Sequence, residues 1–439
     1  MNDLLFCARA VHFAATILAA GVVFFLTAIA EPAFRYGELD RTLAIAVRRR
    51  LARIAWISLA LAALSGAAWL ALIAASMSGE PLAEVVPHDV LWTVLTRTDF
   101  GNDWLARAAV AGFLAAAFIR FLRPADAKPA WLSAVTAILA AALVGSLAFA
   151  GHAIGGQGSE AIVHPTADVL HLVAATAWVG TLLPLAVLLE AARRGGAWLA
   201  VARAAILRFS TLGIASVGTL IVTGVINTWY LVGSVAALIG SDYGRLLIAK
   251  IALFFGMVAI AAVNRLYLTR RIVGAADAVA AQRTLRQLRR NAGAEATIGT
   301  IVIVIVAALG IMVPASHAVH HHAPSASIPP DASFQHIHSE QGMADVMLEP
   351  GHVGTAQATI RLWNDDLETL AAREVTLTLT APSPGSKPAS HVARQDTDGA
   401  WIVDGVKLSE PGNWMVGVDA VLSSGKRLEL DAPIVIDAR

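Results

Sequence analysis

Eight long apolar segments decide what this chain can fold into. A bilayer core requires about 20 consecutive apolar residues per helix, and the chain offers eight such runs. Only 15% of its 439 residues are charged and 57% are hydrophobic, which excludes a water-soluble fold for the region that contains them. We therefore expect an all-α polytopic membrane bundle. The runs cover residues 4–30, 51–75, 104–122, 131–149, 166–189, 205–232, 245–268 and 296–314.

Arginines alternate between the connecting loops. Clusters of basic residues follow the first, third, fifth and seventh segments. The loops at 76–103, 150–165 and 233–244 contain one basic residue between them, Arg97. By the positive-inside rule this predicts that both termini lie outside the cytoplasm. The first segment is too long for a signal peptide core, so we expect it to stay as a membrane helix. A net charge of +1 gives no reason to expect nucleic-acid binding.

The sequence of the membrane region contains an internal repeat. The echoes keep their order, which predicts two parallel four-helix repeats, about residues 1–153 and 166–318, related by an axis along the membrane normal. Binding sites of membrane proteins often lie between such repeats. Each half repeats its histidines, so a site at this interface would draw on both. The echoed pairs are His12–Gly21 with His171–Gly180, Asp99–Arg107 with Asp242–Lys250, and Ala150–Ala153 with Ala315–Ala318.

The chain changes character after residue 314. Residues 315–332 are rich in His, Ala, Ser and Pro, which is typical of an exposed linker. From residue 333 short alternating segments are separated by Pro-Gly, Asp-Gly and Ser-Gly turns. We expect residues 333–439 to form a small all-β, immunoglobulin-like sandwich outside the cytoplasm. The expected strands are Met343–Glu349, Thr355–Asn364, Glu374–Ala381, Ala400–Leu408, Asn413–Leu422 and Arg427–Ile436.

Several motifs of the membrane region resemble the copper-resistance protein D (CopD) family, and the tail resembles the YtkA-like or FixH-like domains fused to such proteins. The resemblance implies copper moved across the bacterial inner membrane, or delivered to a periplasmic copper chaperone or copper enzyme. One departure is Ala19, which stands where the second half has Trp178. The motifs are Gly151-His152-Ala153, Asp168-Val-Leu-His171, Trp178-Val-Gly180, Asp242-Tyr-Gly244 with Lys250, Asn264-Arg265 and Pro314-Ala-Ser-His317.

Four histidines are the first candidates for a membrane metal site: His12, His152, His171 and His317. An imidazole inside a bilayer is costly without a partner, and repetition in both halves argues against four unrelated structural histidines. Imidazole suits copper and also haem iron, so haem b is the alternative cofactor. Asp168 shares a helical face with His171 and could orient it, with Trp178 nearby.

Outside the membrane, His320, His321 and His322 form a His-rich tract that either captures metal or is simply solvated. On a strand, His336 and His338 share one face, as do Met343 and Met347. Imidazole and thioether together suit copper, although the two methionines could instead fill the sandwich core. His88 and His164 are expected to be surface residues of outer loops.

Four charged residues are assigned structural roles: Arg107 and Lys250 are expected to snorkel or to pair with Asp103 and Asp242. The sequence contains no nucleophile–base motif and no phosphate-binding loop, so no catalytic residue is assigned. Three functions remain open: copper uptake or delivery, a b-type haem electron carrier or metal reductase, and an assembly scaffold for respiratory copper enzymes. The partners expected are the lipid bilayer and a periplasmic copper protein.

Overall fold

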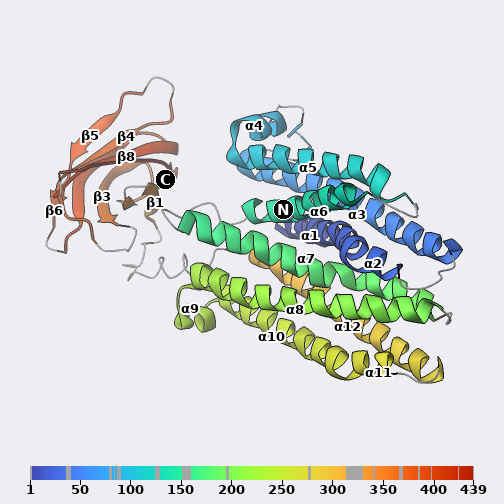
Figure 1. Ribbon diagram of the computed structural model, residues 1–439. Coiled ribbons are helices and arrows are strands. Elements are labelled where there is room, and N and C mark those ends of the chain that lie inside the picture. Colours follow the sequence, from blue (N-terminus) through green and yellow to red (C-terminus); the bar gives the residue numbers. More distant parts are fainter. Residues whose placement is uncertain are drawn as a thin grey trace. The chain divides into compact units, whose positions relative to one another are not determined.

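Eight helices in the computed structural model are long and apolar enough to span a membrane, which confirms the expected bundle (Figure 1). The spans are Asp3–Ala33, Ala44–Ser76, Phe100–Phe121, Ala130–Phe149, Ile162–Ala192, Trp198–Val232, Asp242–Val273 and Val279–Leu309. The structure describes residues 2–35, 41–78, 82–83, 85–86, 90–123, 129–150, 160–193, 197–274, 278–312, 329, 331–339, 342–364, 369–383, 386–396, 398–423 and 425–438.

Several of these spans are built from more than one helical segment. The first contains a π-helical turn near its end, and the seventh contains another. The elements are α1 (Asn2–Phe24), η1 (Phe25–Ala30), α2 (Glu31–Ala33), α3 (Arg41–Ser78), α4 (Val90–Arg97), α5 (Asp99–Phe121), α6 (Ala130–Gly145), η2 (Ser146–Ala150), α7 (Glu160–Ala192), α8 (Ala197–Val232), α9 (Val235–Gly240), α10 (Asp242–Val263), η3 (Asn264–Thr269), α11 (Arg270–Val273) and α12 (Ala278–Leu309).

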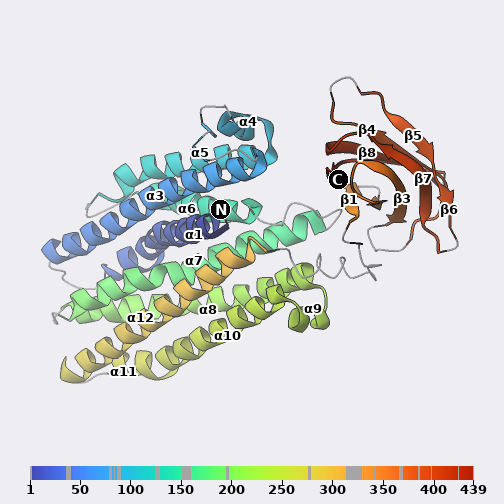
Figure 2. The same ribbon diagram turned by 180° about the vertical axis from the view of Figure 1, so that it is seen from behind.

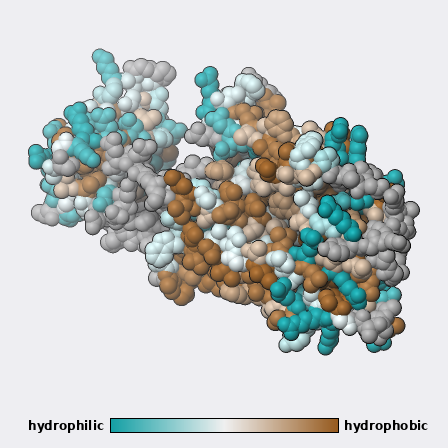
Figure 3. Space-filling model, viewed as in Figure 1, coloured by the Kyte–Doolittle hydropathy of each residue, from teal (hydrophilic) through white to brown (hydrophobic). Residues whose placement is uncertain are grey.

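Helix α1 is the central helix of the membrane unit. It packs against α3, α6, α7 and α12, and 72% of its most apolar stretch is buried, against 11% for the span that contains α10. Large apolar side chains of the outer helices, such as Val225 and Trp229 of α8, are exposed. Hydrophobic surface accordingly covers α8 and α10, with hydrophilic residues toward the end that carries α11 (Figure 3). This distribution is what a lipid-facing surface requires.

Two glycines let α1 and α7 touch through their backbones. A Cβ at Gly21 would lie 2.2 Å from the carbonyl oxygen of Gly180, and a Cβ at Gly180 would lie 2.6 Å from that of Ile17. Small residues at membrane helix interfaces allow such close approach. Gly21 and Gly180 are the last residues of one echoed pair. Their mutual contact is what a twofold axis between the halves would require, and the repeat itself stays a prediction.

A second echo forms the same local structure in both halves. A short helix, α4 or α9, precedes a capped long helix: the Thr98 hydroxyl accepts from Gly101 N and the Ser241 hydroxyl accepts from Gly244 N, both at 3.0 Å. A Cβ at Gly101 would lie 2.2 Å from Val94 O, and one at Gly244 would lie 2.1 Å from a carbonyl of α9. The glycine of each Asp-aromatic-Gly motif is therefore needed for a close turn.

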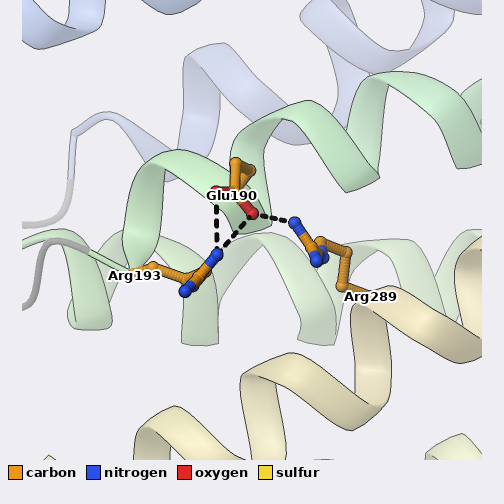
Figure 4. Close-up of polar contacts among 3 residues, drawn as sticks. All are labelled: Glu190, Arg193 and Arg289. Atoms are coloured by element: carbon orange, nitrogen blue, oxygen red, sulfur yellow. Dashed lines mark hydrogen bonds and ion pairs between the residues drawn. The ribbon is translucent and has the colours of Figure 1, made fainter.

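An ion-pair cluster ties two helices together at one end of the bundle. Glu190 of α7 accepts hydrogen bonds from Arg193 of the same helix, at 3.0 Å, and from Arg289 of α12 (Figure 4). All three side chains are partly exposed, so the cluster contributes little stability on its own. It neutralises the only carboxylate that α7 places at this end of its described residues.

The tail forms a compact unit of its own, separate from the membrane unit that ends at residue 319. It contains two antiparallel sheets with strand orders β1-β2-β3-β7-β6 and β5-β4-β8-β9 (Figure 2). All six expected strands are present, while β1, β5 and β6 are additional. The strands are β1 (Ser333–Ser339), β2 (Gly342–Glu349), β3 (Gly354–Trp363), β4 (Ala372–Thr380), β5 (Ala389–Val392), β6 (Arg394–Gln395), β7 (Trp401–Leu408), β8 (Gly412–Leu422) and β9 (Arg427–Ile436).

One core joins the two sheets, since buried side chains from both pack in a single cluster that includes Val346, Ile360, Val375 and Val416. On β2 the core positions are taken by Ala344, Val346 and Leu348. Side chains alternate along a strand, so the intervening residues of β2 point away from this core. The exact boundaries of the linker at 315 and 332 stay a prediction.

Candidate functional site

His171 of α7 is held by a hydroxyl of α8. Its Nδ1 lies 2.9 Å from Thr223 Oγ1, and the same hydroxyl donates its hydrogen to the carbonyl of Thr219 at 2.7 Å. A threonine hydroxyl has only one hydrogen, so it must accept the bond from Nδ1–H. In the neutral imidazole Nε2 is then unprotonated and carries a lone pair. The ring is thus fixed in the form that binds a metal.

His12 of α1 is fixed in the same form by a different partner. Its Nδ1 lies 2.9 Å from the carbonyl oxygen of Ala62 in α3, and a carbonyl can only accept. The side chain is 4% exposed, and its Nε2 has no hydrogen-bond partner among the described residues. Metal-ligating histidines commonly donate their other ring N–H to a carbonyl or similar acceptor. Both histidines therefore offer Nε2 as a ligand atom.

Each imidazole packs beside a glycine of the neighbouring helix. A Cβ at Gly66 would lie 3.1 Å from His12 Cε1, and a Cβ at Gly224 would lie 3.7 Å from His171 Cε1. The preceding residue is a hydroxyl residue in both halves, Ser65 or Thr223. Sequence reasoning missed these dipeptides, although Ser-Gly and Thr-Gly follow their histidines at nearly the same spacing, which could have revealed them.

The surroundings of His12 are strongly cationic. The Arg9 guanidinium lies 4.7 Å from the Trp69 ring centroid, and that of Arg107 lies 5.0 Å from the Trp104 centroid. Both tryptophan rings lie within 6 Å of the His12 ring. Arg107 is buried, as 2% exposure shows, and does not snorkel outward. Cation–π stacking stabilises such guanidinium groups, but their charge opposes a metal cation at His12.

Arg107 also has a structural partner in the next helix. Its Nη2 donates to the Ser146 carbonyl at 2.7 Å and its Nε donates to the Ser146 hydroxyl at 3.1 Å. Asp103 lies within electrostatic reach of the guanidinium. Both observations agree with the structural role expected for Arg107, which fastens α5 to the end of α6.

His171, by contrast, lies in a half that contains a carboxylate. Asp168 Oδ1 accepts a hydrogen bond from Asn227 Nδ2 at 2.7 Å. Lys250 and His164 are within electrostatic reach of Asp168. Lys250 is also within electrostatic reach of His171. The second half therefore places one carboxylate and one ammonium group in this region, where the first half places two guanidinium groups and the carboxylate of Asp103.

Three expectations about this half need correction. Lys250 faces Asp168, whereas Asp242 pairs with Arg245 at 3.0 Å, because residues three apart on a helix lie on one face. The Nδ1 of His171 bonds Thr223 rather than Asp168. His164 is not a surface residue: it lies inside α7, is 8% exposed and stacks on Tyr230 at 5.1 Å.

Trp178 lies two turns beyond His171 but belongs to a different polar cluster. The indole is 1% exposed and bonds the carboxyl group of Glu295 on α12. It therefore contacts a buried acid that sequence reasoning missed. A lone acidic residue directly before the eighth apolar segment was the feature that could have revealed it.

The other membrane histidines, His152 and His317, lie outside the described residues, as do His88 and the His320–His322 tract. Within the described part of the chain no group of three His, Cys, Asp or Glu side chains is arranged to hold a metal. The four-histidine set thus stays a prediction, and the structure describes one of its histidines from each half, His12 and His171.

In the tail, His336 and Asp345 are cross-strand partners on β1 and β2. His336 Nδ1 lies 2.6 Å from Asp345 Oδ1, and Trp363 Nε1 donates to Asp345 Oδ2 at 3.1 Å. Met343 and Met347 occupy the same face of β2 as Asp345, away from the shared core. Neither methionine belongs to that cluster, but Met343 is itself buried, at 7% exposure. The side chain of His338, opposite Met343 in register, lies outside the described residues.

The His336–Asp345 pair should make the stability of the tail depend on pH. The hydrogen bond to Asp345 raises the pKa of His336 above its ordinary value. A raised pKa in the folded state gives stability that is complete below the ordinary pKa and is lost as pH rises through the folded one. We expect Asp345→Asn to remove this pH-dependent part, worth less than about 1 kcal/mol for a partly exposed pair, while its amide oxygen can still accept from Trp363 Nε1.

The measurement is an NMR titration of His336 with thermal unfolding of the isolated tail between about pH 5 and 8. Asp404→Asn serves as the control, because Asp404 bonds Gln357 and Arg394 and touches no histidine. An unchanged titration of His336 in Asp345→Asn would contradict the assignment.

Comparison with known proteins finds the same family in both halves of the membrane unit. The model of Copper resistance protein D matches residues 203–309, and that of the Copper resistance protein D-like, N-terminal domain matches residues 1–162. The chain is 31% identical over 239 residues to Copper resistance protein D of Pseudomonas syringae pv. tomato, covering 54% of this chain and 74% of that protein.

Two further relatives have similar sequences. Inner membrane protein YebZ of Escherichia coli (strain K12) is 30% identical over 224 residues, which cover 51% of this chain and 72% of YebZ. Copper transport protein CutJ of Bacillus subtilis (strain 168) is 26% identical over 333 residues, covering 74% of this chain and 56% of CutJ.

Proposed function

Because this chain belongs to the copper resistance protein D family, we propose that it takes up or delivers copper at the bacterial inner membrane through a histidine site near the outer face. Relatives named for copper resistance, copper transport and the inner membrane support this function. The arginine alternation supports an outer location for both termini and for the tail.

The observation that carries the proposal is the state of His171. The Thr223 hydroxyl accepts from Nδ1–H, and this leaves the Nε2 lone pair for a metal. Copper in either oxidation state is a cation. In the second half Asp168 balances the charge of Lys250, whereas in the first half two guanidinium groups, those of Arg9 and Arg107, lie near one carboxylate, Asp103, so the second half suits copper better. We therefore assign the principal copper ligand to His171, with His12 as a weaker or secondary position.

The remaining ligands in this proposal come from the other repeated histidines and from the tail. His152 and His317 follow the fourth and eighth spans and would lie at the outer side with His171. The tail and linker would capture copper first, with His336, His338, Met343 and Met347 as the tail ligands. Met347 lies on the other face of β2 from the tail core and is partly exposed, which supports its availability, whereas Met343 is buried at 7% exposure. A periplasmic copper chaperone or copper enzyme would be the partner of the tail.

The purified full chain tests the proposal directly. We expect a colourless protein that binds copper in equilibrium dialysis, because nothing in the tail or in the described helices demands a coloured cofactor. A histidine with Nδ1–H engaged can also be an axial haem ligand, and the visible spectrum distinguishes the two. A strong Soret band in the purified protein, or a failure to retain copper against a competing chelator, would contradict the copper assignment.

A further inference from the structure

A buried acid in α12 is not explained by copper binding. Glu295 is 0% exposed and lies in the middle of the last membrane span. Asn264 Nδ2 donates to its Oε1 at 2.8 Å, and Asn291 Nδ2 donates in turn to Asn264 Oδ1 at 2.6 Å. The indole of Trp178 is a further donor to the carboxyl group. The second oxygen, Oε2, has no hydrogen-bond partner among the described residues.

The carboxyl group lines a cavity of about 410 Å³ between α7, α8, α10 and α12. Most of the lining is apolar, and two of its α8 residues, Ile214 and Ile221, are about half exposed on the lipid-facing surface of the helix. The polar side chains on the wall are few: Ser210, Asn264, Arg265, Thr269 and Glu295. A largely apolar cavity with one acid at its wall is a recognisable binding site for a small species.

No positive charge contacts Glu295 within the described residues. Arg265 is the one charged residue besides Glu295 on the cavity wall, and its Nη1 donates to Ser210 Oγ at 2.7 Å. The Glu190 carboxylate of α7 is bound to Arg193 and Arg289 (Figure 4). The α8 residues that line the cavity are apolar except for Ser210. On α12, Asn291 is connected to the carboxyl group only through Asn264, to which it donates a hydrogen bond.

A carboxylate surrounded by neutral groups inside a bilayer is costly, and a bound proton removes that cost. The single unpartnered oxygen suits one hydrogen. A hard metal cation requires about six oxygen ligands, and copper prefers nitrogen and sulfur donors, so neither fits this set. The geometry therefore selects a proton as the species bound.

The partner of the acid lies on an irregular piece of helix. Asn264 begins the π-helical turn η3, and its carbonyl accepts from the Thr269 hydroxyl at 2.9 Å. Such turns occur frequently at functional sites because they interrupt the regular hydrogen-bond ladder. The residue that bonds Glu295 is thus placed at the junction between α10 and an irregular helical turn.

We propose that Glu295 is an exchangeable proton-binding site, that the adjoining cavity gives access to it, and that Asn264 positions its carboxyl group. Proton exchange here would link copper movement to the proton gradient, and only this link rests on the proposed copper function. The site itself does not depend on copper.

Two measurements on the full chain in lipid vesicles test the site. Infrared spectroscopy should show a protonated carboxyl band that is absent in Glu295→Gln and retained in Glu190→Gln. Dicyclohexylcarbodiimide, an apolar reagent, should label Glu295: the carboxyl O–H adds across one C=N bond and the acyl group moves to nitrogen, so nothing is lost. Labelling should fall as pH rises. In Asn264→Leu it should persist to higher pH, because the amide that donates to the carboxylate is removed.

Identical carboxyl bands in the wild type and Glu295→Gln would overturn the proton site. A protonated Glu295 that no pH allows the carbodiimide to label would overturn the access route. The link to copper is tested by copper flux into vesicles with an imposed proton gradient. There, Glu295→Gln should remove the dependence on the gradient and keep copper binding at equilibrium. A wild type that binds no copper would defeat the proposed function alone and leave the proton site standing.

Discussion

His171→Ala should lower the copper affinity of the full chain by about 100-fold or more. That figure is the upper end of the loss seen when a group that only orients a ligand is removed, and here the ligand itself is lost. The physical reason is that His171 offers an unprotonated Nε2 on the side of the bundle that contains Asp168. Copper affinity is measured by competition with a chelator of known affinity.

Thr223 provides a sharper test of the same site. Thr223→Val keeps the shape of the side chain but removes the acceptor of Nδ1–H, and should weaken copper binding by about 10-fold. Thr228→Val is the matched control, since Thr228 makes the same bond to a carbonyl four residues earlier in α8. Thr228 has no histidine partner among the described residues. Equal affinities for the two valine variants would mean that Thr223 does not orient a ligand.

Gly21→Ala should prevent the membrane unit from assembling in its native form. The new Cβ would lie 2.2 Å from the Gly180 carbonyl oxygen, a contact with backbone that no rotamer change relieves. Overpacking of a tight interface costs about 1–3 kcal/mol, and a backbone clash should lie at or above the upper end. We expect a large drop in the apparent melting temperature in detergent, with loss of copper binding.

The control is another helical glycine in the same unit. A Cβ at Gly112 of α5 meets nothing within 4 Å, so Gly112→Ala should be neutral or should stabilise its helix by up to about 1 kcal/mol. Gly180→Ala should resemble Gly21→Ala, because its Cβ would lie 2.6 Å from the Ile17 carbonyl. A Gly21→Ala variant with the same melting temperature as the wild type would show that α1 and α7 do not cross at these residues.

The eight membrane helices and six of the strands were predictable because their causes are local. The length of an apolar run decides whether it spans a bilayer, and turn residues mark where strands end. The two Asp-aromatic-Gly motifs were visible as echoes, but their cause is a turn in which Gly101 and Gly244 approach backbone carbonyls. The sequence repeat located the two motifs, but it did not show why each of them requires a glycine.

In the tail, the alternation of residue types along a strand did not predict which face of the strand is buried. Both sets of alternate residues on β2 contain apolar members, so period-two alternation separated the faces without saying which one is buried. The structure places Ala344, Val346 and Leu348 in the core and leaves Met343 and Met347 on the other face. The burial of each face depends on the second sheet, whose strands are distant in sequence.

The sequence by itself determined the membrane class, the helix number and the histidines worth testing, because hydrophobic length and residue type are properties of single segments. Tertiary structure decided which groups surround those histidines. Thr223 reaches His171 from 52 residues away, and Asn264 reaches Glu295 from 31. Arg9 and Arg107 meet over Trp69 from different helices. Charge and hydrogen bonding at a site depend on how helices pack, and packing brings together residues that no local pattern connects.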